Sequence, residues 1–457
     1  MRTTRLWVLV GFLMLSQACH VTHYQRHAEF HALFLAGAFR DADALLSKRK
    51  YAMQHKAQLL YYLDKGTLAH LMQQYEASNY FFEQAYLTCE NFSAKPLAKI
   101  LAFIIHPTIV DYRGEDHEIL LLHYYKTLNF LQLGQKESAL VECRRLNIKL
   151  NQLSDQYSSD KKYRRDAFIH TLMGLVYQAN HEYNNAFIAY RNAIEIYQED
   201  YQHLFGLEAP DQLKKDLIYT AYKTGLYEQV DQYKQEFKLA YDPAEEVVGS
   251  DVVFLWNNGL GPVKDKWNIN FVLSHKADRV VSFRNEALGL FFTFPLLTND
   301  ESKSLSDLTR IRVTLPKYRE RPLLYDKAII YTHDGQQHAL EVLEDVNSIA
   351  FQVLRQRTAS ELGKSLLRVA LKKAAEYKIK KQNELLGKIV GGIGFATEQA
   401  DTRNWQTIPH SIYYARLRLH EGAHRITFKA FSEKGPTPLP KIKNSSSNCI
   451  TTKQCFR

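Results

Sequence analysis

The sequence predicts an α+β multidomain protein, in which an all-α repeat solenoid precedes a β-sandwich-like domain with a long basic helical insertion. Three observations predict this architecture. From residue 24 to about 240, prolines are few and apolar residues recur every three or four positions, as in helices. After residue 242, short β-rich runs alternate with turn residues. The length of 457 residues, with 46% apolar and 24% charged, excludes a wholly disordered chain, a collagen and a disulfide-knotted mini-protein.

Residues 1–18 have the composition of a secretory signal peptide. Two arginines precede an apolar run of ten residues, and Ala18 supplies a small residue at the cleavage position. Cys19 follows directly and resembles the acylated cysteine in the lipobox of bacterial lipoproteins. Ser16 stands where that pattern prefers leucine, so ordinary cleavage or a plain N-terminal anchor stays open. By the same resemblance, His20 favours an outer-membrane lipoprotein that faces the periplasm or the cell surface.

Residues 19–241 are predicted to form the helical repeat domain. The clearest repeat spans residues 167–198, where small and aromatic residues occupy the positions that they hold in a tetratricopeptide repeat. These residues are Gly174, Tyr177, Tyr183, Ala186, Tyr190 and Ala193. Small residues let two helices approach closely, and the tyrosines fill the space between hairpins. Residues 62–89 and 123–150 repeat the pattern more loosely, and a generic helical bundle is the alternative.

Residues 242–433 are predicted to form the β-rich domain. The expected strands lie at residues 252–256, 289–294, 311–315, 328–332, 412–419 and 424–431. Gly, Pro, Asn or Asp bound each run and favour turns there. Residues 420–423 connect the last two runs, and this short connection predicts a hairpin between them.

The helical insertion at residues 345–395 concentrates positive charge. Residues 355–388 hold ten Lys or Arg against three Glu, an excess of seven in a chain of net charge +10. The predicted basic surface comprises Lys364, Arg368, Lys372, Lys373, Lys380 and Lys381. Such a helix, followed by the glycine-rich residues 387–395, could bind an anionic lipid surface or an anionic polymer. The alternative is a helix that packs on its own domain and exposes a solvated basic face.

Residues 434–457 are predicted to be a flexible tail, because Pro, Ser and Lys dominate them. Cys449 and Cys455 are close together there, and an oxidising periplasm would permit a disulfide between them. Cys89 and Cys143 lie in helical patterns, so we expect them to be buried thiols.

Asp401, Arg403 and Trp405 form the sharpest polar cluster of the sequence. The three residues could bind a ligand through an Arg–carboxylate pair and an aromatic wall. Alternatively, an Asp–Arg pair holds a loop in place and Trp405 lies in the core. The sequence alone is compatible with both interpretations.

Catalytic and metal-binding patterns are scarce. His23, His27 and His31 share one helix face and could hold a transition metal, but Glu29 is the only nearby carboxylate. The sequence has no Gly-x-Ser-x-Gly elbow and no phosphate-binding loop. We therefore expect no catalytic residue, no metal site and no cofactor.

Three separated segments carry a family resemblance. Residues 112–149 begin with Tyr-Arg-Gly-Glu-Asp-His-Glu, residues 257–264 read Asn-Asn-Gly-Leu-Gly-Pro-Val-Lys, and residues 400–409 are followed by 415–417 and 421–424. Together they resemble a family of uncharacterised bacterial lipoproteins with N-terminal tetratricopeptide repeats. The resemblance implies a location in the cell envelope and carries no catalytic assignment.

These features predict a membrane-tethered scaffold protein. Its expected partners are envelope proteins at the repeat domain, the membrane at the N-terminal lipid, and an anionic lipid or polymer at the basic helix. Nucleic acid is disfavoured by export and by the lack of a recognisable binding module. Two alternatives are an envelope enzyme that acts on a cell-wall polymer, and a peripheral protein that inserts into membranes or oligomerises through the basic helix.

Overall fold

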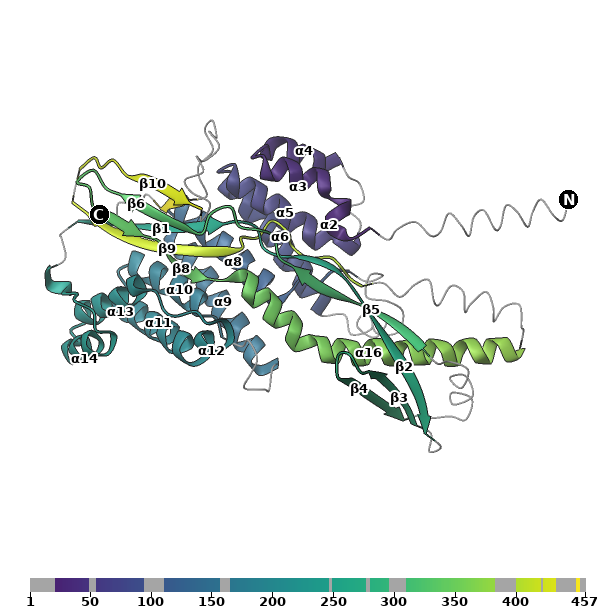
Figure 1. The fold of residues 1–457 in the computed structure, drawn as a ribbon. Helices are drawn as coiled ribbons and strands as arrows, with labels where there is room; N and C mark the ends of the chain where they lie inside the picture. The colour runs from purple at the N-terminus through teal and green to yellow at the C-terminus, as the bar shows by residue number, and fades with distance from the viewer. Residues whose placement is uncertain are drawn as a thin grey trace.

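The structure, a computed structural model, describes residues 21–48, 55–93, 111–156, 165–245, 249–276, 280–295, 310–382, 400–420, 422–432 and 449–452. The predicted signal peptide, Cys19, the glycine-rich residues 387–395 and Cys455 lie outside the described residues. Helices make up the described chain up to residue 245, and strands dominate from residue 250 (Figure 1). The coarse α+β fold class is therefore confirmed.

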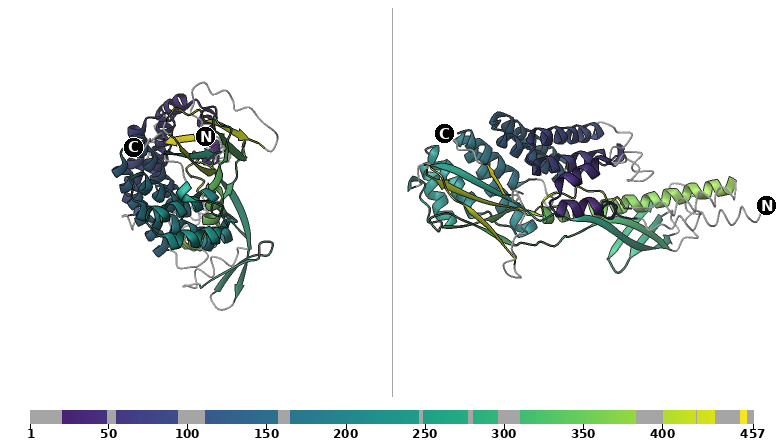
Figure 2. Two further views of the ribbon diagram at one scale, coloured as in Figure 1. Left: turned by 90° about the vertical axis from the view of Figure 1, so that its left-hand side faces the viewer. Right: turned by 90° about the horizontal axis from the view of Figure 1, so that it is seen from above.

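The helical domain consists of short antiparallel helices that pack in chain order. They are α2 (His23–Arg26), α3 (Ala28–Leu35), α4 (Phe39–Lys48), α5 (Gln58–Leu71), α6 (Tyr75–Ser93), α8 (Asp116–Gln132), α9 (Lys136–Gln156), α10 (Ala167–Ala179), α11 (Tyr183–Ile196), α12 (Gln202–Phe205), α13 (Asp211–Lys223) and α14 (Tyr227–Phe237). The π-helical turn η4 (Tyr197–Tyr201) joins α11 to α12, and the 3-10 turns η2 (His55–Ala57) and η5 (Pro243–Glu245) flank the domain's longer helices. Seen end-on, the helices form a curved row around one side of the strands (Figure 2).

One type of turn connects the two helices of five successive pairs. The second residue after each first helix has a positive φ, between 61° and 76°. The next residue donates its backbone N–H to the carbonyl five positions earlier, at 2.8–2.9 Å. The turn residues are Gly37, Gln73, Gly134, His181 and Gly225. Such a left-handed C-cap ends the first helix and reverses the chain, so the same local device recurs along the domain.

The strands form three antiparallel sheets. They are β1 (Ser250–Asn258), β2 (Val263–Lys276), β3 (Val280–Asn285), β4 (Leu290–Pro295), β5 (Arg310–Arg319), β6 (Lys327–Tyr331), β7 (Gln337–Ala339), β8 (Glu341–Glu344), β9 (Ser411–Leu419), β10 (Thr427–Phe431) and β11 (Cys449–Thr452). The strand orders are β11-β1-β9-β8, β10-β6-β7 and β4-β3-β2-β5. The first two sheets pack against each other through a shared core that includes Phe254, Ile330 and Leu417.

The predicted hairpin between residues 412–419 and 424–431 is wrong. Strand β9 pairs with β1 from Ser250↔Leu419 to Asn258↔Ser411, whereas β10 pairs with β6 in a different sheet. The reason is that β9 is buried on both faces, with Tyr414 in the helical core and Tyr413 in the core between the sheets. Strand β9 therefore has β1 and β8 as its two neighbours, and no edge is left for β10.

The helical domain and the first sheet share a single hydrophobic core. This core joins helix residues such as Leu122, Phe168 and Leu217 to Trp405 and Ile412 of the second half. Residues 405–414 thus contribute side chains that lie against the helices on the inner side of the curved row (Figure 2). The inner side of the helical domain is filled by the chain itself.

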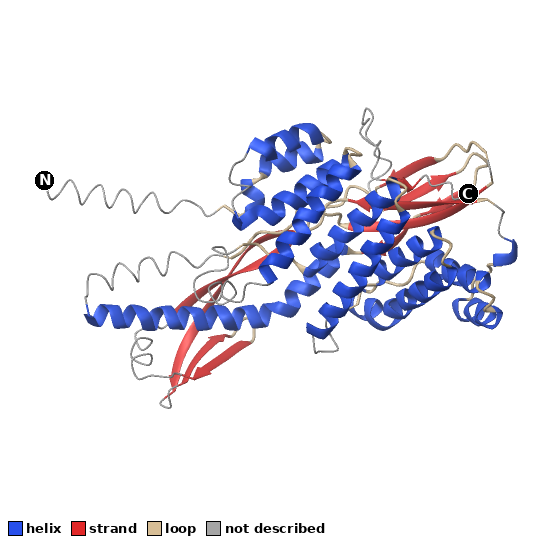
Figure 3. Cartoon of the chain, turned by 180° about the vertical axis from the view of Figure 1, so that it is seen from behind, coloured by secondary structure: helices blue, strands red, loops and turns tan. Residues whose placement is uncertain are grey.

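The long helix α16 (Val346–Gln382) and the sheet β4-β3-β2-β5 project together from this body (Figures 1 and 3). We define the arm as residues 265–276, 280–295, 310–319 and 358–382. The inner face of its sheet packs on α16 through Phe271, Phe283 and Val313 against Leu362 and Leu366. The arm therefore has a small hydrophobic core of its own.

Candidate functional site

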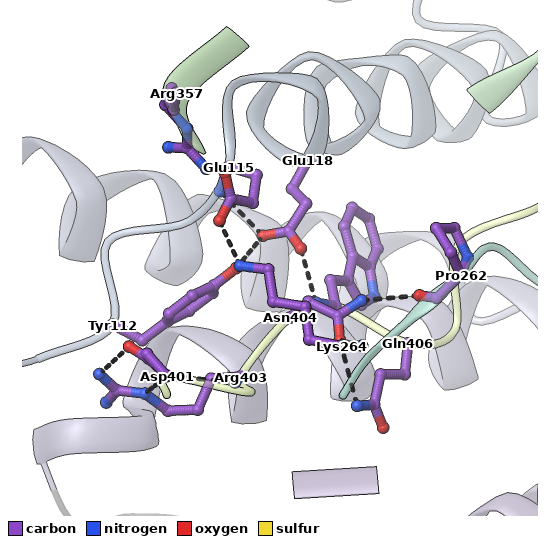
Figure 4. Close-up of polar contacts among 11 residues, drawn as sticks. Tyr112, Glu115, Glu118, Pro262, Lys264, Arg357, Asp401, Arg403, Asn404 and Gln406 are labelled. Atoms are coloured by element: carbon purple, nitrogen blue, oxygen red, sulfur yellow. Dashed lines mark hydrogen bonds and ion pairs between the residues drawn. The ribbon is translucent and has the colours of Figure 1, made fainter. Parts of the chain in front are cut away.

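The three segments that carry the family resemblance meet in space (Figure 4). Glu115 and Lys264 are in contact although 149 residues separate them, and Glu118 and Trp405 are in contact across 287 residues. Charged side chains gather at this junction, which we call the buried charge cluster. Its members are Glu115, Glu118, Lys264, Arg357, Asp401 and Arg403.

Glu115 binds two cations from other parts of the chain. Its carboxylate accepts hydrogen bonds from the Lys264 ammonium at the start of β2 and from the Arg357 guanidinium on α16. The side chains of Glu115 and Lys264 are only 7% and 4% exposed. Burial by itself raises the pKa of Glu115, but the positive charges of Lys264 and Arg357 hold this pKa below its ordinary value. These ion pairs connect α8, β2 and α16, and removing one partner would leave a buried charge uncompensated.

Glu118 connects the start of α8 to the segment 400–410. Its Oε2 accepts the Tyr112 hydroxyl at 2.7 Å and the backbone N–H of Glu115 at 3.0 Å, and its Oε1 accepts the backbone N–H of Trp405 at 2.7 Å. The bond from Glu115 is part of a capping box at the N-terminus of the helix. Burial and the charge of Glu115 raise the pKa of Glu118.

Trp405 is fully buried among the helices. Its ring lies 5.9 Å from the Phe82 ring and 5.8 Å from the Tyr125 ring. The indole N–H donates to Thr407 Oγ1 at 2.8 Å, and the Thr407 hydroxyl lies 2.9 Å from Asp64 Oδ1 on α5. Burial raises the pKa of Asp64 to about 7. The aromatic wall expected for a ligand is therefore part of the protein core.

Asp401 and Arg403 bind each other. Arg403 Nε and Nη2 donate to the two oxygens of Asp401 at 2.9 and 2.7 Å, and Arg403 Nη1 donates to the carbonyl of Lys56 at 2.5 Å. The Arg403 side chain is 11% exposed. Because the Asp401 carboxylate occupies the guanidinium fork, the geometry favours the interpretation in which this pair holds the loop.

The predicted basic surface is only partly a surface. Lys364 is exposed and lies 3.5 Å from Glu361, but Arg368 is 5% exposed, so its assignment to the surface is wrong. The buried face of α16 includes polar residues as well as the apolar stripe, because Ser365 and Arg368 are buried beside Leu366. Lys372, Lys373, Lys380 and Lys381 lie on α16, with side chains outside the described part of the structure.

The apolar stripe of α16 has a partner. Leu362, Leu366 and Val369 pack on the sheet of the arm, so they are not available to enter a membrane. This packing agrees with the alternative in which the helix lies on its own domain.

Two histidines near the same stretch of sequence have partners of their own. His424 lies beside His333 and His420, and His410 lies beside Glu320. In the described part of the chain, no group of three or more His, Cys, Asp or Glu is arranged to hold a metal ion. Among the three histidines that share a helix face in the sequence prediction, the ring centroids of His23 and His27 lie 4.2 Å apart. The third, His31, instead contacts Gln406, with 2.6 Å between its Nε2 and the amide Oε1.

A cavity of about 350 Å³ lies between α13, the end of β9 and the β6–β7 turn. Its arginines are already paired: Arg416 contacts Asp216 at 3.4 Å, and Arg418 binds Asp251 through two bonds of 2.7 and 2.8 Å. These pairs neutralise the two arginines and join β9 to α13 and β1. The arginines of the cavity wall therefore hold the two halves together.

Sequence reasoning missed the central ion pair. Lys264 and Glu115 both lie in the segments that were singled out, yet neither was assigned a role, and Arg357 was counted only as helix charge. The sequence did hold one signal for a buried charge. Lys264 follows apolar and glycine residues, in Gly-Pro-Val-Lys at 261–264. Cys89 and Cys143 are buried in the helical core, as predicted.

None of the described helices combines the length and the apolar character needed to cross a membrane.

The contacts of the buried charge cluster connect the two halves of the body, so we interpret this cluster as a structural junction. No family model matches the chain, and a search of curated proteins finds no match. The lipoprotein family therefore stays an expectation from the three sequence segments and Cys19.

Proposed function

We propose that this protein is a membrane-tethered lipoprotein of the cell envelope that acts as an assembly scaffold through a tetratricopeptide-like helical domain. The recurring left-handed turns after five first helices support the repeat assignment. The two sheets that share one core support a small β-sandwich beside it. In this proposal Cys19 carries the lipid, and envelope proteins bind the helices.

One observation supports a partner surface on the helical domain. Tyr80 and Leu87 on α6 are 60% and 44% exposed, and Val141 and Ile148 on α9 are 44% and 57% exposed. Residues seven apart lie on the same face of a helix, so each helix exposes a large apolar pair. We call these four residues the outer patch.

The helices α6 and α9 are neighbours. Arg145 on α9 contacts Glu83 on α6 at 3.1 Å, and Lys149 contacts Glu90 at 3.9 Å. The two apolar pairs therefore flank a row of ion pairs on adjacent helices. Large exposed apolar residues rimmed by charges are typical of protein–protein contact sites. Since residues of the second half pack against the inner side of the described helices, the outer patch is a surface that a partner can reach.

Affinity capture of the tethered protein, followed by mass spectrometry, tests the scaffold function. We expect the variant Tyr80→Ser/Ile148→Ser to lose an envelope protein that the unchanged chain recovers. The matched control is Leu35→Ser/Tyr227→Ser, whose side chains are 65% and 61% exposed on other helices. Recovery of the same proteins by all three chains would place the partner elsewhere, and no reproducible envelope partner would contradict the scaffold proposal.

The lipid anchor has its own test. Labelled palmitate should enter the unchanged chain and not Cys19→Ser. Label that persists in Cys19→Ser would contradict acylation at this residue.

A further inference from the structure

The outer face of the arm's sheet, opposite α16, carries an unusual row of side chains. Arg284 on β3 pairs with Phe291 on β4 and with Val272 on β2, and Val272 also pairs with Arg310 on β5. The four residues therefore lie side by side across all four strands, in the order Phe291, Arg284, Val272, Arg310. In such a row the side chains project from the same face of the sheet.

All four side chains are open to solvent. Phe291 is 61% exposed, Val272 is 55% exposed and the Arg284 side chain is 63% exposed, and Arg310 is also exposed. Leu288, in the turn between β3 and β4, adds another apolar side chain at 45% exposure. Large apolar residues alternate here with arginines on a face that no described segment covers.

The arm also holds the charge of the whole chain. Its described segments contain 14 Lys or Arg against four Asp or Glu, an excess of ten. The rest of the chain has 45 of each, so the net charge of +10 resides in the arm. Such an excess attracts an anionic surface over about one Debye length.

The start of the described chain lies at the base of the arm. Helix α2 contacts β2, and the Tyr24 ring lies 5.8 Å from the Arg319 guanidinium at the end of β5. Arg310 begins the same strand nine residues away, which corresponds to about 30 Å along the arm. A membrane attachment just before Val21 would therefore place the row within reach of the bilayer.

We infer that the outer face of the arm's sheet binds the surface of an anionic lipid bilayer, with Arg284 and Arg310 at the headgroups and Phe291, Val272 and Leu288 at the acyl boundary. The apolar members of the row favour a bilayer over a soluble polyanion, because a soluble polyanion offers no apolar region in which these side chains can be buried. Interfacial membrane binding combines apolar burial with attraction to anionic lipids in this way. The inference rests on the proposed envelope location for the supply of lipid, and not on the scaffold function.

The test uses the full chain in vesicles, with an environment-sensitive fluorescent amino acid in place of Leu288. The matched control places the same probe at Leu324, which is 74% exposed on the body. We expect a blue shift at position 288 with phosphatidylglycerol vesicles, none with phosphatidylcholine vesicles, and none at position 324. High salt should weaken the response, because exposed charges are screened.

Variants then assign the response to the row. Arg284→Ser/Arg310→Ser should raise the lipid concentration at half-maximal shift about twenty-five-fold, since each surface cation contributes about fivefold. Phe291→Ser should lower the size of the shift. Arg40→Ser/Arg191→Ser, two exposed arginines of the helical domain, should leave both quantities unchanged.

Several results would overturn the inference. These are an absent shift with phosphatidylglycerol, an equal shift with phosphatidylcholine, or the same shift with polyphosphate in place of vesicles. Flotation on phosphatidylcholine vesicles separately reports the N-terminal attachment. A chain that does not float there but shows the shift with phosphatidylglycerol would contradict the tether and support the arm.

Discussion

The body and the arm use the same charged residue types in opposite ways. In the body, Glu115 and Lys264 are removed from water, and Glu115 binds both Lys264 and the half-buried Arg357. In the arm, Arg284 and Arg310 are exposed, and basic residues outnumber acidic ones. A buried ion pair fixes chain segments because an unpaired buried charge is costly, whereas exposed charges contribute little to stability and create a field. Burial, and not residue type, therefore separates the structural charges of this protein from those available to a partner.

The largest expected effect comes from Lys264. We expect Lys264→Met to lower the free energy of unfolding by about 3–5 kcal/mol, because the buried Glu115 carboxylate loses one of its two cations. In the arm, Arg284→Met should change it by less than about 0.5 kcal/mol, as for other exposed residues. Urea denaturation followed by circular dichroism measures both. Equal effects for the two variants would remove the distinction between body and arm.

Much of the fold could be predicted from local sequence patterns. The small and aromatic residues at 167–198 correctly predicted a tight helix pair, in which Gly174 lies against the Tyr190 ring. The strands at 252–256, 311–315 and 412–419 and the long helix after residue 345 were also predicted, because alternation and helical periodicity are local properties.

Long-range pairing could not be predicted in this way. Nothing local to 412–419 indicates that this strand pairs with β1 rather than β10, since its alternate residues enter two different cores. For the same reason Asp401, Arg403 and Trp405 could be named as a cluster, but their burial depended on helices several hundred residues earlier. Arg368 was assigned to the surface incorrectly. An apolar stripe predicts which side of a helix is buried, but it does not predict how many polar residues beside the stripe are buried with it.

A second prediction concerns pH and belongs to the body. Asp64 has its pKa raised to about 7 by burial, against an ordinary value of 3.8. The folded state therefore holds this proton more tightly, so the stability from Asp64 is fully present below about pH 4 and is lost as pH rises to about 7. Asp64→Asn keeps an acceptor for Thr407 but cannot ionise. Its stability relative to the unchanged chain should rise with pH over this range, by up to about 4 kcal/mol.

Chemical denaturation of both chains from pH 4 to pH 8 measures this difference. Groups that do not interact with Asp64 titrate alike in both chains and cancel in the comparison, whereas the repulsion between Asp64 and Glu118 is part of the expected difference. A stability difference that stays constant over the range would show that Asp64 ionises normally in the folded protein.

A smaller effect separates two helical glycines. A Cβ at Gly174 would lie 2.3 Å from the Tyr190 ring, whereas one at Gly363 would lie 3.9 Å from Phe292. Gly174→Ala should cost about 1–3 kcal/mol through overpacking between α10 and α11. Gly363→Ala, on α16 in the arm, should stabilise by about 0.5–1 kcal/mol because alanine favours a helix. Thermal melting should therefore shift in opposite directions, and a shared direction would contradict the close packing of the body.

The smallest expected effect tests whether the two parallel hydrogen bonds of a guanidinium group are needed at position 403. Arg403 makes two parallel bonds to Asp401 and one to the Lys56 carbonyl, while Arg319 in the arm lies 3.8 Å from Asp265 with its side chain 55% exposed. Lysine keeps the charge but cannot reproduce the planar fork. We expect Arg403→Lys to cost about 1–2 kcal/mol and Arg319→Lys less than about 0.5 kcal/mol, both measured by urea denaturation. Because charge is unchanged in both variants, a loss confined to Arg403→Lys would show that geometry, rather than the sign of the charge, holds the segment 400–410 in the body.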